Sequence, residues 1–139
     1  MANDQAPIVV VGVDGSPESQ QAVDWAERYA TASGATLRLV IAWEHAQAYG
    51  QPMMFEGYHP HEEADALVNK VKGAMAVPAD RVETRVVEGA PGPALVASAE
   101  GADALVVGSQ GHGAVSSLLL GSVSSYCVHH ASCPIVVVR

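Results

Sequence analysis

The stretch PIVVVGVDGSPES, residues 7–19, decides the fold of this chain. Its first half is a nearly uninterrupted apolar run, which is typical of a strand that helices cover on both faces. Its second half begins a helix, because Ser16 suits the N-cap position and Pro17 the first helical position. Apolar residues then recur at helical spacing as far as Gly34, a residue type that ends helices. The stretch therefore predicts a strand, a tight turn and an amphipathic helix.

The same alternation runs through the rest of the chain. Strands are predicted at 7–14, 35–43, 81–89, 103–109 and 134–139, and helices at 16–32, roughly 61–76, 93–100 and 122–131. Five strands joined by helical crossovers favour an α/β fold: a single doubly wound, five-stranded parallel sheet flanked by helices, Rossmann-like, with ligands at the carboxyl ends of the strands. The sheet-facing side of the first helix is predicted to carry Ala22, Val23, Ala26, Tyr29 and Ala30.

Length, composition and charge narrow the possible classes of protein. With 139 residues, 49% of them hydrophobic, the chain suits one domain spanning 1–139. It has no apolar run long enough for a membrane span, and its start is acidic where a secretory signal would be basic, so we expect a cytosolic protein without a membrane partner. The net charge of −8 and the presence of only two lysines argue against a nucleic-acid partner.

Two turns are expected to share one crevice. They are VDGSPES (13–19), after the first strand, and VVGSQGHG (106–113), after the fourth. If these strands are neighbours, both turns open at the same edge of the sheet. Gly111 can take a positive φ, so main-chain N–H groups there can converge on an anion. The crevice is therefore the predicted ligand site.

The start of the last predicted helix supplies further donors to this crevice. Gly121 and Ser122 open the helix, where free N–H groups and the helix dipole favour negative charge. No lysine or arginine occurs between residues 108 and 126. Main-chain donors, together with Ser109, Ser122 and Ser124, are therefore expected to hold phosphate in place of charged side chains.

The spacing of these glycines is also a family signature. The pattern G-x2-G-x9-G-[ST], formed by Gly108, Gly111, Gly121 and Ser122, resembles the nucleotide-binding motif of the universal stress protein family. The segments VVVGVDGSPES, EGAPGPALVASAEGADALVVGSQGHG and LLGSVSSYCVHHASCPIVVVR are similar to that family in order and spacing. Only residues 44–80 carry no family-specific signal, so the resemblance covers most of the chain.

The resemblance implies a fold, a ligand and an assembly. Members of the family have a parallel sheet in the order 3-2-1-4-5 and fall into ATP-binding and non-binding classes. They usually form homodimers through the last strand. Since the glycine motif is intact, the resemblance places this chain with the proteins that bind ATP. A carboxylate at Asp14 would repel a triphosphate unless Mg²⁺ (or Mn²⁺) bridges the two.

Carried over position by position, the resemblance also implies a set of site residues. Asp14 would lie near the ribose, the phosphates or their metal, and Ala42 would meet the adenine through its main chain. Val13 and Val107 would form walls for the base and ribose. The residues implied to hold the ribose and phosphates are Gly108, Ser109, Gly111, Gly121, Ser122, Val123 and Ser124. His112 departs from the pattern, because relatives often have arginine or lysine there and a neutral imidazole attracts a triphosphate less.

Other interpretations of these residues stay open. The glycines could serve only a turn and a close helix–strand contact, and Asp14 could cap the first helix together with Ser16. The competing function is a dimeric interaction module that binds nucleotide weakly or prefers another adenine nucleotide such as cyclic AMP. No catalytic residue is assigned, and ATP hydrolysis is expected to be slow or absent, because residues 108–126 offer no cation for the transition state.

Several other chemistries lack their motifs. The chain has no G-x4-G-K-[ST] phosphate loop, no G-x-G-x-x-G after the first strand and no G-x-S-x-G elbow. The segment CVHHASC, residues 127–133, does not bring four ligands together as zinc requires. Residues 44–60 fit no period and predict a mobile loop beside the site, in which His45 and His59, with His61 just after it, are solvated.

Overall fold

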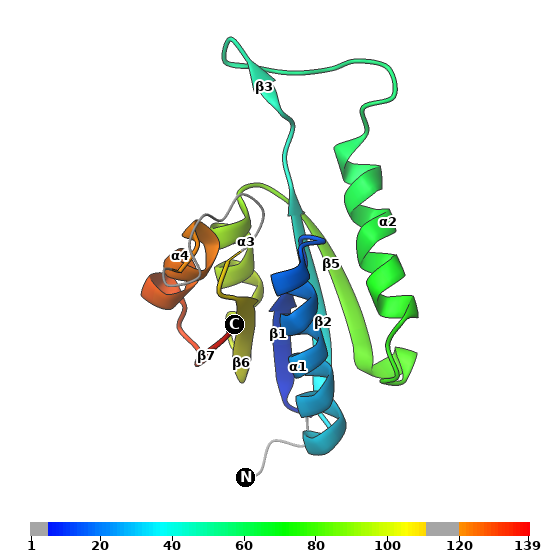
Figure 1. The fold of residues 1–139 in the computed structure, drawn as a ribbon, viewed down its shortest axis with the longest axis vertical. Coiled ribbons are helices and arrows are strands. Elements are labelled where there is room, and N and C mark those ends of the chain that lie inside the picture. The colour runs from blue at the N-terminus through cyan, green and yellow to red at the C-terminus, as the bar shows by residue number, and fades with distance from the viewer. Residues whose placement is uncertain (1–5, 111–119) are drawn as a thin grey trace.

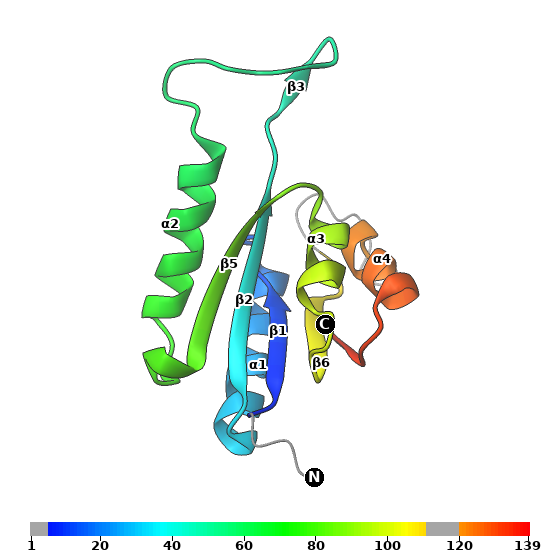
Figure 2. The same cartoon turned by 180° about the vertical axis from the view of Figure 1, so that it is seen from behind.

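The computed structural model describes residues 6–110 and 120–139 and contains a five-stranded parallel sheet with helices on both faces (Figures 1 and 2). The strands are β1 (Ile8–Gly12), β2 (Thr36–Trp43), β5 (Val82–Glu88), β6 (Ala104–Gly108) and β7 (Ile135–Val138). The helices are α1 (Pro17–Ser33), α2 (Pro60–Gly73), α3 (Pro91–Ser98) and α4 (Ser122–His130), with a short 3-10 turn at Ala79–Arg81.

The sheet order is β5-β2-β1-β6-β7. Counting only the five strands of this sheet, the order is 3-2-1-4-5, so the predicted fold and strand order are confirmed. β1 lies between β2 and β6, and its carboxyl end therefore adjoins that of β6. This is the arrangement that brings the two glycine-containing turns to one edge.

Burial on both faces explains why the strands are continuously apolar. Val9 and Val11 of β1 join the core that α1 and α2 cover, whereas Val10 between them joins the core beneath α3 and α4. All three valines are fully buried. Successive side chains of a strand point to opposite faces, so a central strand with helices on both sides needs apolar residues throughout.

The ends of α1 follow the sequence signals. The Ser16 hydroxyl oxygen accepts a hydrogen bond from the Ser19 N–H at 3.1 Å, and Pro17 occupies the first helical position. Gly34 ends the helix with φ 76°, and its N–H donates to the Ala30 carbonyl. The prediction that Tyr29 packs on the sheet is wrong. Tyr29 is 42% exposed, and its ring stacks on that of Trp25 instead.

Two other predicted segments differ from the structure. The third helix begins at Pro91, two residues earlier than expected, because a helix accepts proline in its first turn and can start at either of two closely spaced prolines. The segment predicted as a loop at 44–60 contains a small antiparallel hairpin of β3 (Gln47–Ala48) and β4 (Gln51–Pro52). Its two turn residues both have positive φ, as tight hairpin turns require.

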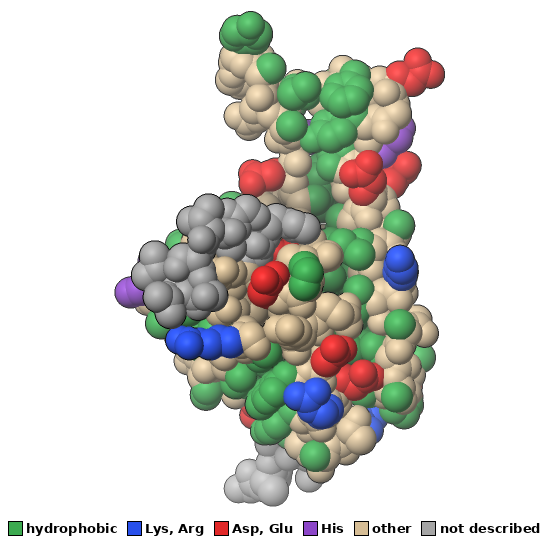
Figure 3. Space-filling view, viewed as in Figure 1, with side chains coloured by type: hydrophobic (Ala, Val, Ile, Leu, Met, Phe, Trp, Pro, Cys, Tyr) green, Lys and Arg blue, Asp and Glu red, His purple; other side chains and the backbone are tan. Residues whose placement is uncertain are grey.

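This hairpin segment projects from the body of the protein beyond the carboxyl end of β2 (Figure 1). Hydrophobic side chains gather on it in the space-filling view (Figure 3), and the exposed large ones are Tyr49, Met53, Met54 and Phe55. At its base His59 and His61 are exposed, as expected, but His45 is half-buried. The rings of His45 and His61 lie 5.3 and 5.4 Å from the ring of Trp43, so they help to join the segment to α2.

One glycine of the predicted site is required for packing. A Cβ atom on Gly108 would lie 2.8 Å from the main-chain oxygen of Glu18, closer than real Cβ contacts come. Because that neighbour is helix backbone, it cannot rotate away as a side chain could. The end of β6 therefore passes against the first turn of α1 only because residue 108 has no side chain.

We predict that Gly108→Ala lowers the free energy of unfolding by about 2 kcal/mol, the usual cost of overpacking. Gly73→Ala is the matched control, because a Cβ there meets nothing within 4 Å and its φ is not positive. It should change stability by no more than about 0.5 to 1 kcal/mol, in the stabilising direction if at all. Urea unfolding measures both. Equal stability of Gly108→Ala and wild type would show that helix and strand can separate at no cost.

Candidate functional site

The main-chain oxygen of Ser109 organises the edge of the sheet where the ligand is predicted. It accepts hydrogen bonds from the Gly121 N–H and from the Ser124 hydroxyl, both at 2.7 Å. The Ser109 N–H in turn donates to the Val138 carbonyl of β7 at 2.8 Å. The residue that follows β6 is thus bonded both to the neighbouring strand and to the start of α4. The helix N-terminus is thereby held at the carboxyl end of β6.

The first turn of α4 contains the donors available for an anion. Gly121 is the N-cap, and its carbonyl accepts from the Ser125 N–H at 2.9 Å. Ser122 is exposed and Val123 half-buried, and N–H groups at these positions have no partner within a helix. The Ser124 hydroxyl is buried and bonded to Ser109, so its role in the described structure is to hold the fold.

Gly121 has an ordinary backbone conformation. Its φ of −69° and ψ of 172° are extended values that any residue adopts. Glycine is therefore not needed here for its conformational freedom, in contrast to a turn with positive φ. Gly111 and His112, the remaining members of the predicted motif, lie outside the described residues.

The turn after β1 holds Asp14 at the same edge. One carboxylate oxygen of Asp14 accepts from the Ser16 N–H at 2.8 Å, and the Asp14 N–H donates to the Ser19 hydroxyl at 3.1 Å. That hydroxyl donates to the Gly12 carbonyl. Asp14 is exposed and so remains accessible to a ligand. The turn thus gives Asp14 the helix-capping role considered above and leaves contact with a ligand possible.

Ala42 lies where β2 extends past the end of β1. The Val13 N–H donates to the Val40 carbonyl at 2.8 Å, which is the last bond between the two strands, and the Trp43 carbonyl accepts from Gly89 on the opposite side. Main-chain groups alternate in direction along a strand. The N–H and C=O groups of Ala42 therefore point to the side where β1 has ended.

The two predicted wall residues do not share one surface. Val13 and Val107 are almost fully buried, with 5% and 3% exposure. Val13 belongs to the core under α1 and α2, and Val107 to the core under α3 and α4. They therefore support the carboxyl edge of the sheet from opposite faces.

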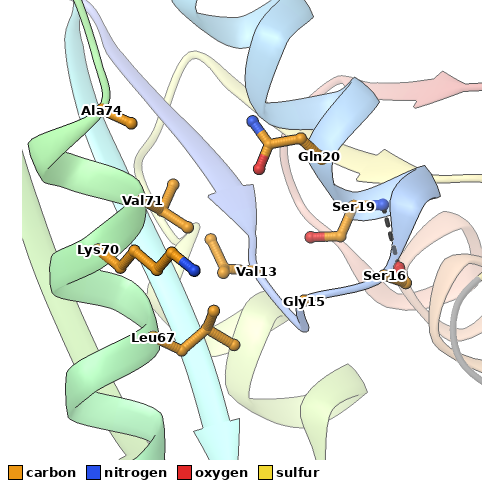
Figure 4. A pocket seen from close by; sticks show the side chains of 9 residues that line it. All are labelled: Val13, Gly15, Ser16, Ser19, Gln20, Leu67, Lys70, Val71 and Ala74. Carbon is orange, nitrogen blue, oxygen red and sulfur yellow. Dashed lines mark hydrogen bonds between the residues drawn. The ribbon is translucent and has the colours of Figure 1, made fainter.

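Sequence reasoning missed a hollow of about 230 Å³ beside this edge, between the first turns of α1 and the later turns of α2 (Figure 4). Its lining residues are Val13, Gly15, Ser16, Ser19, Gln20, Leu67, Lys70, Val71 and Ala74. Lys70 extends across the hollow toward Val13. The only sequence signal for it is that Lys70 falls directly before Val71 and three residues after Leu67, at the border of the apolar stripe of α2.

The two cysteines and the neighbouring histidines do not form a reactive or metal centre in the described residues. Burial, followed by the nearby Cys133, raises the pKa of the Cys127 thiol to about 11, and burial also raises the pKa of Cys133. Neither supplies a thiolate readily at neutral pH. Residues 6–110 and 120–139 contain no group of three or more metal-ligating side chains, and both cysteines are free.

Comparison with known proteins agrees with this geometry. The family model described as the universal stress protein family matches residues 7–139. A universal stress protein from Thermus aquaticus is 35% identical, with 94% of this chain and 97% of that protein covered. A universal stress protein from Mycobacterium tuberculosis is 39% identical, but the chain spans about half the length of that relative, 47%. The chain belongs to the universal stress protein family.

A solved structure adds information on ligands. A universal stress protein in complex with cAMP is 34% identical over 96% of both chains, with a TM-score of 0.63. An adenine nucleotide is thus bound by a relative of similar length and fold. Among the described residues of the present chain, no helix has both the length and the apolar character needed to cross a bilayer.

The division of labour within the first turn of α4 can be tested with two serine variants. Ser124→Ala should lower the free energy of unfolding by about 1 kcal/mol, since it removes a buried hydrogen bond to Ser109. Ser122→Ala, at an exposed position two residues away, should change it by less than about 0.5 kcal/mol. Chemical denaturation of both variants gives the comparison. A larger loss from Ser122→Ala would contradict the assignment of the structural role to Ser124.

Proposed function

We propose that this chain binds ATP together with Mg²⁺ or Mn²⁺ in the crevice between β1 and β6 and acts as a nucleotide-regulated stress-response module in the cytoplasm. The observation that carries the proposal is the pair of hydrogen bonds to Ser109, which hold the N-terminus of α4 beside the ends of these strands. Helix N-termini at such an edge bind phosphate through main-chain N–H groups.

Each remaining part of the nucleotide has a complementary group. Ala42 presents free main-chain groups of the kind that recognise the edge of an adenine ring. Asp14 is accessible and carries the negative charge that a divalent ion bound to phosphate oxygens would neutralise. Gly121 needs no special backbone conformation, and its missing side chain instead leaves room for the phosphates to reach the first turn of α4.

The second candidate is a module that prefers cyclic AMP or binds nucleotide weakly. It is favoured by the cAMP complex of the 34% identical relative and by His112, a neutral residue where a cation is common. The cyclic monophosphate carries one negative charge and needs less neutralisation than a triphosphate. A panel of ATP, ADP, AMP and cyclic AMP, each with and without Mg²⁺, separates the two candidates by thermal shift.

Slow turnover is part of the proposal, because two of the arginines already have structural partners. Arg38 bonds to Glu83 and the Ser98 carbonyl, and Arg81 bonds to the carbonyls of Ala30 and Ala35. Neither guanidinium is available to stabilise charge that develops during phosphoryl transfer. Bound nucleotide would therefore act as a regulatory ligand.

Replacement of Gly121 by valine should abolish nucleotide binding and leave the fold intact. A branched side chain at the N-cap would fill the space that phosphate needs, whereas the main chain there already has values that valine accepts. Calorimetric titration with ATP and with cyclic AMP, after a circular dichroism check of folding, measures the effect. Undiminished binding of both nucleotides by the folded variant would refute the proposed site.

Chelation with EDTA should weaken ATP binding, because the carboxylate of Asp14 would then face the phosphates without a bridging ion. Asp14→Asn should remove most of this metal dependence, since the repulsion disappears with the charge. ATP affinity that is the same with and without EDTA would reduce Asp14 to a helix cap.

A homodimer through β7 is the proposed assembly. β7 is an edge strand of valines and isoleucine that are only half-buried, which makes it a pairing surface. The carbonyls of Pro134 and Val138 accept from Leu105 of β6 and from Ser109 just after it, so by alternation Val137 directs its main-chain groups to the open side. Val137→Pro should therefore break the dimer without removing a bond to β6.

Light scattering at micromolar concentration tests this assembly. We expect wild type near twice 14.4 kDa and Val137→Pro near 14.4 kDa. The control is Val137→Thr, which keeps the N–H group, the β-branched shape and therefore the dimer. A monomeric wild type would overturn the proposed assembly.

A further inference from the structure

The hollow between α1 and α2 is a second candidate binding site, separate from the nucleotide crevice. Of the residues predicted to contact the nucleotide, only Val13 lines it. We propose that it binds small monocarboxylic acids with a short apolar chain, with the ammonium group of Lys70 against the carboxylate. No part of this inference depends on the chain binding ATP.

The apolar surface of the hollow belongs to residues of the core that α1 and α2 share. Val13 is nearly fully buried, and Leu67 and Val71 are half-buried residues packed against the same cluster. Their exposed surfaces face the hollow from the turn after β1 and from α2 (Figure 4). An alkyl chain laid on these three side chains would remove apolar surface from water on both molecules.

The polar part offers two donors. The Ser19 hydroxyl is already used, because it donates to the Gly12 carbonyl and accepts from the Asp14 N–H. The Ser16 oxygen accepts from the Ser19 N–H, which leaves the Ser16 hydroxyl proton for a ligand. Lys70 extends over the hollow from the opposite wall. A carboxylate, which accepts hydrogen bonds only, matches these two donors.

Lys70 forms no ion pair in the described part of the chain. The ion pair found within residues 6–110 and 120–139 joins Arg38 and Glu83. In a protein of net charge −8 that has two lysines, one of them therefore extends over a hollow without a protein counter-charge. An anion in the hollow would supply that counter-charge and form a charge-assisted hydrogen bond.

The far wall limits the ligand to a single negative charge. The Gln20 amide nitrogen donates to Asp24 at 3.0 Å, which turns its amide oxygen toward the hollow (Figure 4). A second carboxylate or a doubly charged phosphate would face that oxygen, which cannot donate a hydrogen bond to it. The wall thus favours a monocarboxylate over a dicarboxylate or inorganic phosphate.

The test is a titration followed by ¹⁵N–¹H correlation spectra of the full chain at constant ionic strength. The probes are acetate, butyrate and hexanoate, with succinate and inorganic phosphate as multiply charged comparisons. We expect saturable shifts at Gly15, Gln20 and Val71, with affinity rising about fourfold for each methylene that becomes buried. Succinate and phosphate should bind more weakly than butyrate.

Lys70→Gln should weaken hexanoate binding about tenfold, the effect of losing a charge-assisted hydrogen bond. Lys72→Gln is the matched control, because it removes the same charge from the same helix at a position that does not line the hollow. It should leave the affinity within twofold of wild type. An equal loss in both variants would assign the effect to general charge and overturn the site.

Three other outcomes would also overturn the inference: no saturable shifts in the hollow, equal affinity for acetate and hexanoate, or tighter binding of phosphate than of butyrate. Titration of Lys70→Gln with ATP keeps the two sites distinguishable, because the ATP affinity of this variant is expected to match that of wild type. If the wild-type protein binds ATP but does not bind hexanoate, only the present inference is contradicted. If the wild-type protein binds hexanoate but does not bind ATP, only the proposed nucleotide function is contradicted.

Discussion

The hydrogen bonds to the Ser109 carbonyl are the contacts on which the arrangement of the candidate site depends. A strand that has ended leaves its next carbonyl without a ladder partner, and a helix that begins leaves its first N–H groups without acceptors. Here these two needs are met together, because Gly121 and Ser124 both donate to Ser109. The start of α4 is thereby fixed to the end of β6, although 11 residues separate Ser109 from Gly121 in sequence. The remaining free N–H groups of α4 consequently open at the carboxyl edge of the sheet.

The two glycines of the sequence motif that the structure describes, Gly108 and Gly121, differ in their surroundings and conformation. Gly108 is glycine because helix backbone lies where its side chain would be. Gly121 has neither a positive φ nor an unusual ψ, so its backbone conformation does not require glycine. A motif that looks like one signal in the sequence thus contains one glycine needed for packing and another whose backbone conformation any residue can adopt. Close helix–strand packing, one of the two interpretations that the sequence left open, applies at Gly108, whereas ligand access at Gly121 stays a prediction.

The sequence was most informative where burial is complete. Strands buried on both faces must be apolar throughout, so the order and type of the main elements followed from composition and the turns. It was least informative at the edges of the helices. Tyr29 and Lys70 both lie beside an apolar stripe, and helical periodicity gives the buried face of a helix but not the neighbour of each flank. Whether such a residue meets solvent, another ring or a hollow depends on tertiary packing. That is why Tyr29 was misplaced and Lys70 was not found.

The two candidate sites differ in the groups that would bind an anion. At the crevice, donors are main-chain N–H groups held by the fold itself, and Arg38 and Arg81 are bonded elsewhere to carbonyl and carboxylate oxygens. Replacing a side chain leaves such donors in place, and proline alone among the amino acids removes the main-chain N–H group. At the hollow, one flexible lysine supplies the charge, and a single substitution can abolish it. The two proposed sites thus differ in kind, because one relies on main-chain dipoles fixed by the fold and the other on the charge of one flexible side chain.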